Sequence, residues 1–362
     1  MRLTKNKIAQ VLSIALIFAF LVPGAVGAAE APATMTLEEA VSRALNNDSS
    51  IKTAVMNVDK SEFQDQMAAD AWTNLVGNGR YTDAMLYQTM TAAMNSRLSH
   101  DSSLKAVQTA REKIENNTQK LYMNVKSADR DLVLAQLDYN ITQRQMSQAQ
   151  LFYQNGLASN SSLIMMEAQF EMKKKDLESK KIDLDQAYYD FNRQVRLPLD
   201  SRYQLIDEIA YAPVGNIDID YHITRLMEES PDLWQAEQAL KVAEMSLTAA
   251  AYGENNQYRV QEITLNQNRM TVADGKKSFT DSMRSLYATL LKLEGNYATL
   301  EQALKVAEED YRIAVLKYEL GMITPIDLLS KEQAYEKAKG GLTSMIYSYQ
   351  SAKMAFEKPW AA

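Results

Sequence analysis

Apolar residues recur every three or four positions along two long stretches of the chain. The steps alternate strictly between four and three residues, first from Leu121 to Tyr153 and again from Leu286 to Tyr318. Such steps place one stripe on one face of an α-helix, and their mean of about 3.5 residues is typical of helices that supercoil around neighbours. The pattern therefore predicts two long amphipathic helices. The first stripe comprises Leu121, Val125, Ala128, Leu132, Ala135, Tyr139, Thr142, Met146, Ala149 and Tyr153.

The two stripes share one register, which indicates an internal repeat. Every member of the second stripe lies 165 residues after its counterpart in the first, and the match continues downstream, where Phe191 corresponds to Phe356. An earlier pair of segments matches at an offset of 182, with Leu37 corresponding to Ile219. Each half is therefore expected to contain a short opening helix, a connection, a long helix, a glycine turn and another long helix.

The ends of the long helices carry recognisable signals. Gly156 and Gly321 stand where a helix should stop, since glycine tolerates the left-handed conformation there. After Gly321, the segment Thr324–Asp327 offers a hydroxyl N-cap, a proline in the first turn and a carboxylate near the helix dipole. Residues 159–162 offer hydroxyl and amide caps after Gly156. Each glycine thus marks the tip of an antiparallel hairpin, whose first helix is expected to begin near Ser102 and to run for ~80 Å.

The first residues of the chain read as a targeting signal. Arg2, Lys5 and Lys7 precede an apolar run from 11 to 22, and small residues follow up to Ala28. This pattern predicts a signal peptide at 1–28, with an uncleaved anchor as the alternative. We then expect a first helical repeat at 29–200, a linker at 201–218, a second repeat at 219–358 and a C-terminal tail at 359–362.

Composition narrows the classes of function. The chain has no cysteine, which excludes disulfides, thiolate metal sites and cysteine nucleophiles. The formal charge is −7, and removing Arg2, Lys5 and Lys7 takes it to −10, which argues against binding to nucleic acid. The two histidines, His100 and His222, lack the spacing of a metal site. We find no catalytic constellation, so neither an enzyme nor a cofactor or metal site is expected.

Methionine is abundant and allows two interpretations. Met165, Met166 and Met172 could serve the export of a soft metal, whereas methionine more commonly fills irregular seams between helices. We favour the second interpretation.

Several segments together resemble the TolC-like family of outer-membrane efflux proteins. Residues 35–47 resemble the family's first helix, and Arg196–Asp200 resembles the segment that closes the first half. Asn155–Leu157 and Leu320–Met322 resemble the paired motifs at its hairpin tips. The resemblance covers nearly the whole chain after the signal, and the order and duplication of the motifs carry it.

This resemblance implies an exported homotrimer that forms a helical tunnel through the periplasm, at or near the outer membrane. It further implies that a periplasmic adaptor protein and an inner-membrane transporter dock at its tip. Gly156, Leu157, Gly321 and Met322 would lie at that adaptor-facing tip. Asp327 matches a family carboxylate that rings the entrance, where three copies would converge.

The entrance departs from the family pattern in two places. The second carboxylate position of the family is Ser330 here, and the first-half equivalent of Asp327 is Ser162. The hypothesis that follows is a weaker or differently controlled constriction. Asp327 could equally be a helix N-terminal carboxylate that complements the dipole.

Channels of this family also insert a pair of strands into each half. The corresponding segments, 72–95 and 253–278, lack the alternation that membrane strands require. We therefore expect an all-α fold of two tandem repeats of long antiparallel coiled-coil hairpins, a TolC-like α-barrel protomer with its β-barrel strands reduced or absent. This leaves an alternative function open, that of a barrel-less helical scaffold or spacer in the cell envelope.

Overall fold

The computed structural model describes residues 34–250 and 255–362, and the predicted signal peptide at 1–28 lies outside these ranges. Within them the chain folds into eight α-helices, a short 3-10 helix and two strands of two residues each. The predicted all-α architecture is confirmed. The elements are β1 (Thr34–Met35), α2 (Leu37–Asn47), α3 (Ser49–Asn78), α4 (Asp83–Gln154), α5 (Asn160–Val195), β2 (Gln204–Leu205), α6 (Ile219–Glu229), α7 (Pro231–Ala250), α8 (Asn255–Glu319), α9 (Pro325–Glu357) and η1 (Pro359–Ala361).

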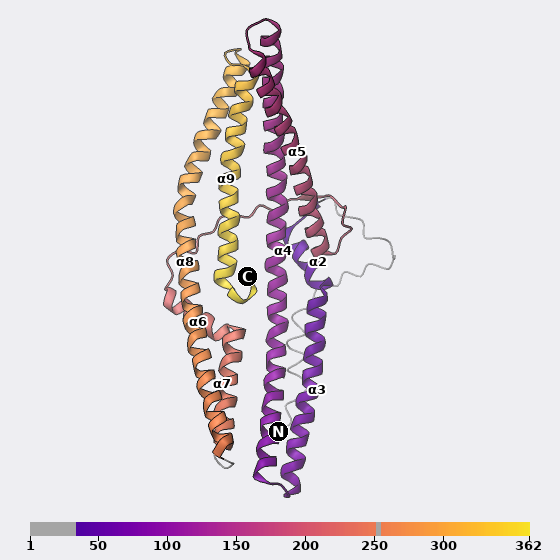
Figure 1. The fold of residues 1–362 in the computed structure, drawn as a ribbon, viewed down its shortest axis with the longest axis vertical. Helices are drawn as coiled ribbons and strands as arrows, with labels where there is room; N and C mark the ends of the chain where they lie inside the picture. The colour runs from indigo at the N-terminus through magenta and orange to yellow at the C-terminus, as the bar shows by residue number, and fades with distance from the viewer. Residues whose placement is uncertain (1–33, 251–254) are drawn as a thin grey trace.

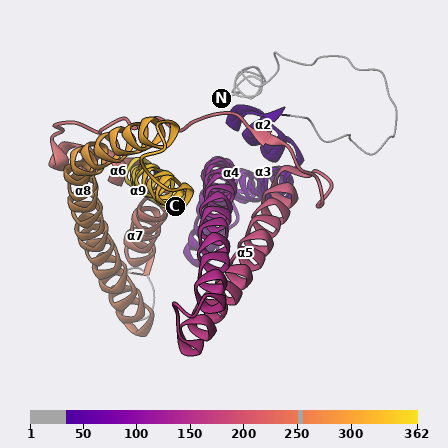
Figure 2. The ribbon, with the colours of Figure 1, turned by 90° about the horizontal axis from the view of Figure 1, so that it is seen from above.

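The long helices lie side by side in an elongated layer (Figure 1). In the half that carries the two tips, the order across the layer is α8, α9, α4 and α5, and each helix contacts the next. In the opposite half the order is α8, α7, α4 and α3. Seen from above, the same succession follows an open arc (Figure 2). The layer therefore has two lateral edges, α8 on one side and α3 with α5 on the other.

The predicted stripes are the packing faces of α4 and α8. Val125 and its counterpart Leu290 are each 1% exposed, and in both stripes only the last member, Tyr153 or Tyr318, is exposed. The opening helices match as well, because α2 and α6 are both 11 residues long and begin at the two aligned positions Leu37 and Ile219. The internal repeat is thus a repeat of structure.

Each repeat has its own core near the middle of the molecule. Tyr122, Phe191 and Tyr203 belong to the first, whereas Leu290 and Phe356 belong to the second. Buried large side chains at these positions exclude water from the points where the helices of each repeat meet. A smaller cluster of Met123, Tyr347 and Met354 joins α4 to α9 and so connects the two repeats.

A small clasp ties the start of the first repeat to its end. β1 pairs in parallel with β2, with Met35 opposite Leu205. The Tyr122 hydroxyl donates to the Met35 carbonyl (3.3 Å) and accepts from the Asp207 amide (3.0 Å). The Leu37 amide donates to the Asp207 carboxylate at 2.7 Å, which fixes the start of α2. Nonlocal contacts therefore position the opening helix.

The first long helix begins well before the position expected from the sequence. α4 starts at Asp83 rather than near Ser102, and its 72 residues correspond to about 110 Å. The Thr82 side chain caps it by accepting from the Met85 amide at 3.3 Å. The sequence contains neither glycine nor proline between 83 and 154, so no residue interrupts the helix. The connection expected before it is also helical and forms α3.

The segments where strand pairs were expected to be reduced or absent are helical. Residues 72–78 end α3, residues 83–95 begin α4, and residues 255–278 belong to α8. Among the described residues, β1 and β2 are the strands, and this part of the prediction is confirmed. No described helix combines the length and the apolar character needed to cross a membrane.

Candidate functional site at the hairpin tips

The first tip is a Schellman turn centred on a left-handed glycine. Gly156 has a φ of 74°, which a side chain would strain. Its amide donates to the Tyr153 carbonyl (3.0 Å), and the Leu157 amide donates to the Phe152 carbonyl (2.8 Å). These two bonds satisfy carbonyls at the end of α4 that would otherwise lack partners. Ser159 then caps α5 by accepting from the Ser162 amide at 3.2 Å.

The second tip repeats this geometry 165 residues later. Gly321 has a φ of 71°, its amide donates to the Tyr318 carbonyl (2.9 Å), and the Met322 amide donates to the Lys317 carbonyl (2.8 Å). A full capping box starts α9, because the Thr324 side chain accepts from the Asp327 amide while the Asp327 carboxylate accepts from the Thr324 amide. Thr324 was predicted as the N-cap, and its role is confirmed.

The two tips lie at the same end of the molecule (Figure 1). Each presents apolar side chains to solvent: Leu157 is 74% exposed, Leu320 74% and Met322 67%. The predicted site residues Gly156, Leu157, Gly321 and Met322 are therefore brought to one end. Exposed apolar side chains that gather at one end of a molecule are typical of contact surfaces.

Asp327 lies at this end as well, with its carboxylate engaged locally. Its Oδ2 accepts from the Thr324 amide (2.9 Å) and from the Thr324 hydroxyl (2.8 Å). These hydrogen bonds favour the ionised form and lower the pKa of Asp327, the backbone bond having the larger effect. Within one chain Asp327 thus acts as a capping carboxylate, which leaves its place in a ring of copies as a prediction.

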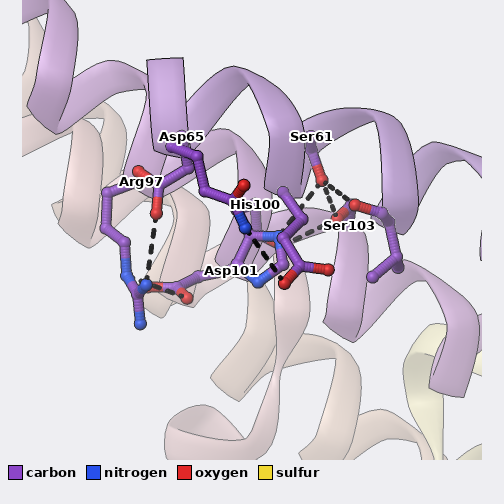
Figure 3. Close-up of polar contacts among 9 residues, drawn as sticks. Ser61, Asp65, Arg97, His100, Asp101 and Ser103 are labelled. Carbon is purple, nitrogen blue, oxygen red and sulfur yellow. Dashed lines mark hydrogen bonds and ion pairs between the residues drawn. The ribbon is translucent and has the colours of Figure 1, made fainter. Parts of the chain in front are cut away.

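A polar cluster with the residue types of a hydrolase lies between α3 and α4 (Figure 3). His100 Nδ1 is 3.3 Å from Ser61 Oγ, and Ser61 Oγ is 2.7 Å from Ser103 Oγ. Ser61 is buried and also donates to the Val58 carbonyl at 2.8 Å. Because the hydroxyl is enclosed and already bonded, we assign the cluster to packing between the helices. In the described ranges no three His, Cys, Asp or Glu side chains group as metal ligands do.

Solved structures with a similar arrangement of helices include outer-membrane channels. The chain superposes on the CmeC outer membrane channel of Campylobacter jejuni with a TM-score of 0.67 and 12% identity, covering 90% of this chain and 85% of that one. The outer membrane protein VceC of Vibrio cholerae gives 0.64 and 12%, covering 90% and 96%. The MtrE outer membrane channel of Neisseria gonorrhoeae gives 0.57 and 15%, covering 90% and 89%.

The chain has a TolC-like fold. Neither descriptions of protein families nor curated proteins give a match, so this likeness rests on structure. The repeats and the paired tips are the parts of the TolC-like fold that the sequence predicted, whereas the clasp between β1 and β2 was not predicted.

The lateral edges of this TolC-like fold carry a feature that sequence reasoning missed. On α5, Met165, Met172 and Ile182 are 61%, 64% and 67% exposed. On α8, Val306 and Leu316 are 56% and 48% exposed, whereas Tyr311 of the same helix stacks on α9. Each edge thus has a second apolar row. Met165 and Met172 do not fill a seam inside the chain, although their spacing of seven residues could have indicated a row.

Proposed function

We propose that this protein is a TolC-like envelope efflux or secretion component. Copies of the chain form a trimeric helical conduit in the periplasm, and its tips dock an adaptor protein that connects it to an inner-membrane transporter. The TolC-like fold and the channels that share it support this proposal. The observation that carries it is the pair of apolar edges on an open layer of helices.

The two edges complement each other as surfaces for head-to-tail assembly. An open layer with apolar rows on both sides buries them if the α5 edge of one copy packs against the α8 edge of the next. Because the two edges differ, this contact is heterologous, and repeated rotation about the long axis closes a ring.

Heights along the long axis indicate which residues of the two edges meet. Each ion pair or hydrogen bond between neighbouring helices joins two residues at about the same height. A series of such contacts leads from α5 across α4 and α9 to α8, and the helical rise of about 1.5 Å per residue places the other residues relative to them. They bring Met165 and Leu316 within about one helical turn of the same height. The contacts are Lys173–Asp138 (2.5 Å), Arg130–Gly340 (3.4 Å) and Lys331–Asp310 (2.8 Å).

The experiment uses paired cysteines in this cysteine-free chain. In the mature protein, Met165→Cys with Leu316→Cys should give a ladder of covalent dimers and trimers on treatment with a short bis-maleimide. Each single variant should stay monomeric on a denaturing gel. Light scattering of the unmodified protein, with and without detergent, should give the mass of three chains. A monomeric mass and no ladder would refute the conduit.

The tips supply the proposed docking site for the adaptor. Leu157 and Met322 would enter apolar pockets of the partner, since both are exposed and held on rigid turns. Leu157→Lys with Met322→Lys should abolish cross-linking to a co-expressed adaptor while leaving the trimer intact. Tyr221→Lys, on an exposed site of α6, is the matched control. Equal cross-linking of the adaptor to the parent protein, the double variant and the Tyr221→Lys control would contradict the assignment.

Asp327 would form the constriction of this conduit. In a trimer three copies would approach the axis, and their mutual repulsion would be relieved by a bound cation. Asp327→Asn should then raise the conductance of reconstituted trimers to anions. A conductance unchanged by this substitution would leave Asp327 with its capping role alone.

A helical scaffold or spacer without channel activity is the second candidate. It is favoured by the helical structure of 72–78, 83–95 and 255–278, where channels of this family were expected to carry strands. A trimer that stays soluble without detergent and conducts no ions would support the scaffold over the conduit.

A further inference from the structure

A partly enclosed cavity of about 640 Å³ lies where the two repeats meet. One wall belongs to α4, and the others belong to the segment before α6, to α6 itself, to the end of α9 and to η1. The C-terminus and α7 lie beside α4 in Figure 1. The cavity is therefore a joint in which walls from both repeats enclose one space.

Four of the charged side chains in this cavity neutralise each other. Glu112 pairs with Lys358 at 3.3 Å and also accepts a hydrogen bond from Trp360. Arg225 pairs with Glu229 at 3.5 Å. The charge that a ligand would meet in the cavity therefore comes mainly from the other side chains that line it.

Three further charged side chains line the cavity and form no ion pair within the described ranges. On the α4 wall, the Lys105 ammonium lies 5.1 Å from the centre of the Trp234 ring, and Thr109 follows one helical turn later. The second repeat supplies the carboxylates of Glu228, on α6, and Glu357, at the end of α9. The first repeat thus offers an unpaired cation and the second offers unpaired anions.

This separation of charge selects against ligands of a single sign. A purely anionic ligand on Lys105 would lie in the same cavity as the free carboxylates of Glu228 and Glu357, and a purely cationic ligand would lie beside a free ammonium. A zwitterion whose charges are several ångströms apart satisfies both walls at once. Its charged groups would form charge-assisted hydrogen bonds, which are stronger than neutral ones.

The size and the remaining lining of the cavity narrow the class of zwitterion. A sphere of this volume is about 11 Å across, and an extended peptide advances about 3.3–3.6 Å per residue, so about three residues span it. Val214, Ile217 and the Trp360 ring add apolar surface to the lining. Such a combination of apolar surface and a few polar groups is typical of sites for small molecules.

We propose that this cavity binds a di- or tripeptide with free amino and carboxyl termini. The carboxylate of the peptide contacts Lys105 and Thr109, and its ammonium contacts Glu228 and Glu357. Because its two ends contact different repeats, the bound peptide stabilises the present arrangement of the repeats over any other. This site does not depend on the proposed conduit, since every residue that forms it belongs to one chain.

The test is calorimetric titration of the mature protein with the tripeptide Ala-Leu-Ala. We expect saturable binding with a Kd of about 1 mM or below. The N-acetylated and the C-amidated forms of the same peptide each lack one charge. Each should bind at least about tenfold more weakly, as the loss of a charged hydrogen bond implies. The free peptide should also raise the midpoint of thermal unfolding, because it binds the folded state.

Substitutions in the cavity assign each end of the peptide to a wall. Lys105→Met should weaken binding of the free peptide about tenfold and remove the difference between the free and the amidated forms. Glu228→Gln with Glu357→Gln should remove the difference between the free and the acetylated forms. Lys181→Met, on an exposed site of α5 outside the cavity, is the matched control and should bind as the parent does. Circular dichroism checks that every variant keeps its helicity.

Several results would overturn the proposal. Absence of saturable binding up to about 10 mM would mean that the cavity holds no peptide of this class. Equal affinity for the free, acetylated and amidated peptides would mean that the unpaired charges do not select the ligand. Preference for the acetylated or the amidated form would mean that the cavity takes the end of a longer chain instead of a free peptide. Lys105→Met with parental affinity and parental discrimination would place the binding elsewhere.

Discussion

Tyr122 and Phe191 meet edge to face with ring centroids 6.0 Å apart, and the residues 165 positions later, Tyr287 and Phe356, form a second pair at 5.8 Å. The first pair is perpendicular (75°) and the second nearly parallel (24°). The repeat therefore preserves which rings meet but not how they meet. Each pair joins the long helix of its repeat to the end of the returning helix.

The two phenylalanines should be among the largest contributors to stability. Phe191 is fully buried and Phe356 is 1% exposed. We expect Phe191→Ala and Phe356→Ala each to lower the free energy of unfolding by about 3–5 kcal/mol, through lost burial and a residual cavity. Denaturant titration measures this. Tyr221→Ala, at an exposed position, should stay within about 0.5 kcal/mol of the parent. A loss as small as the control's would contradict the assigned cores.

Tyr122 should make the protein sensitive to alkali. Burial raises the pKa of Tyr122 from 10.0 to about 12. The folded state thus favours the neutral phenol, so its contribution is complete below pH 10 and is lost as the pH rises through about 12. Between these values stability should fall less steeply for Tyr122→Phe. At neutral pH the same variant should lose about 1 kcal/mol for each hydrogen bond removed. Parallel curves for both proteins would rule this out.

The tip glycines should resist replacement for conformational reasons. Gly156 and Gly321 have positive φ, and a Cβ added to either would meet open space, so the cost is backbone strain alone. Gly156→Val and Gly321→Val should each lower the free energy of unfolding by about 1–2 kcal/mol with nearly unchanged helicity. Gly341→Ala, in a helix with open space around it, should instead stabilise by about 0.5–1 kcal/mol. Stabilisation at all three sites would show that the tips are not left-handed.

The capping box at the start of α9 can be tested by titration. Thr324→Ala should cost about 1 kcal/mol of helix stability through loss of the N-cap. It should also raise the pKa of Asp327, because the hydroxyl donor to its carboxylate disappears. Any stability that Asp327 provides is present above pH 3.8 and is lost as the pH falls through its lowered folded-state pKa. An NMR titration that leaves this pKa unmoved would exclude the capping box.

The 3-10 helix η1 should lock the second repeat onto the first. Trp360 Nε1 donates to the Glu112 carboxylate at 2.5 Å, and Lys358 pairs with Glu112 at 3.3 Å. Trp360→Phe should cost about 1.5–3 kcal/mol, the usual range for a hydrogen bond to a charged group. A double-mutant cycle with Glu112→Gln isolates the bond, and a coupling energy near zero would mean that it contributes nothing.

The features predicted from the sequence are those that depend on nearby residues. The apolar stripe through Val125 and Leu290, the left-handed glycines and the Thr324 cap each follow from residues within a few turns of one another. Because the chain contains an internal repeat, the stripe and the left-handed glycine each occur twice. The start of α4 could not be found in this way, because Ser102 is as good a cap by type as Thr82. The contact between Ser61 of α3 and Ser103 of α4 is nonlocal, and it stabilises helical structure on the N-terminal side of Ser102.

The lateral edges escaped prediction for a different reason. Met165 and Met172 are apolar at helical spacing, which in a single chain indicates core. Nothing in one sequence distinguishes a residue buried in its own chain from one that a second copy would cover. The exposed fractions of these side chains supply that distinction. The same reasoning applies to Asp327. Its capping role can be predicted from the four residues Thr324–Asp327, whereas one sequence does not show whether three copies of Asp327 form a ring.

The clasp between β1 and β2 also sets an order of events during synthesis. Met35 and Leu37 have their partners at Ile206 and Asp207, about 170 residues later in the chain. Because a chain is made from its amino end, α2 must wait, without its final partners, until most of the first repeat exists. The first repeat then closes as one cooperative unit, and the second can assemble on a finished surface. Slow closure of this first loop is where off-pathway association would compete most with folding.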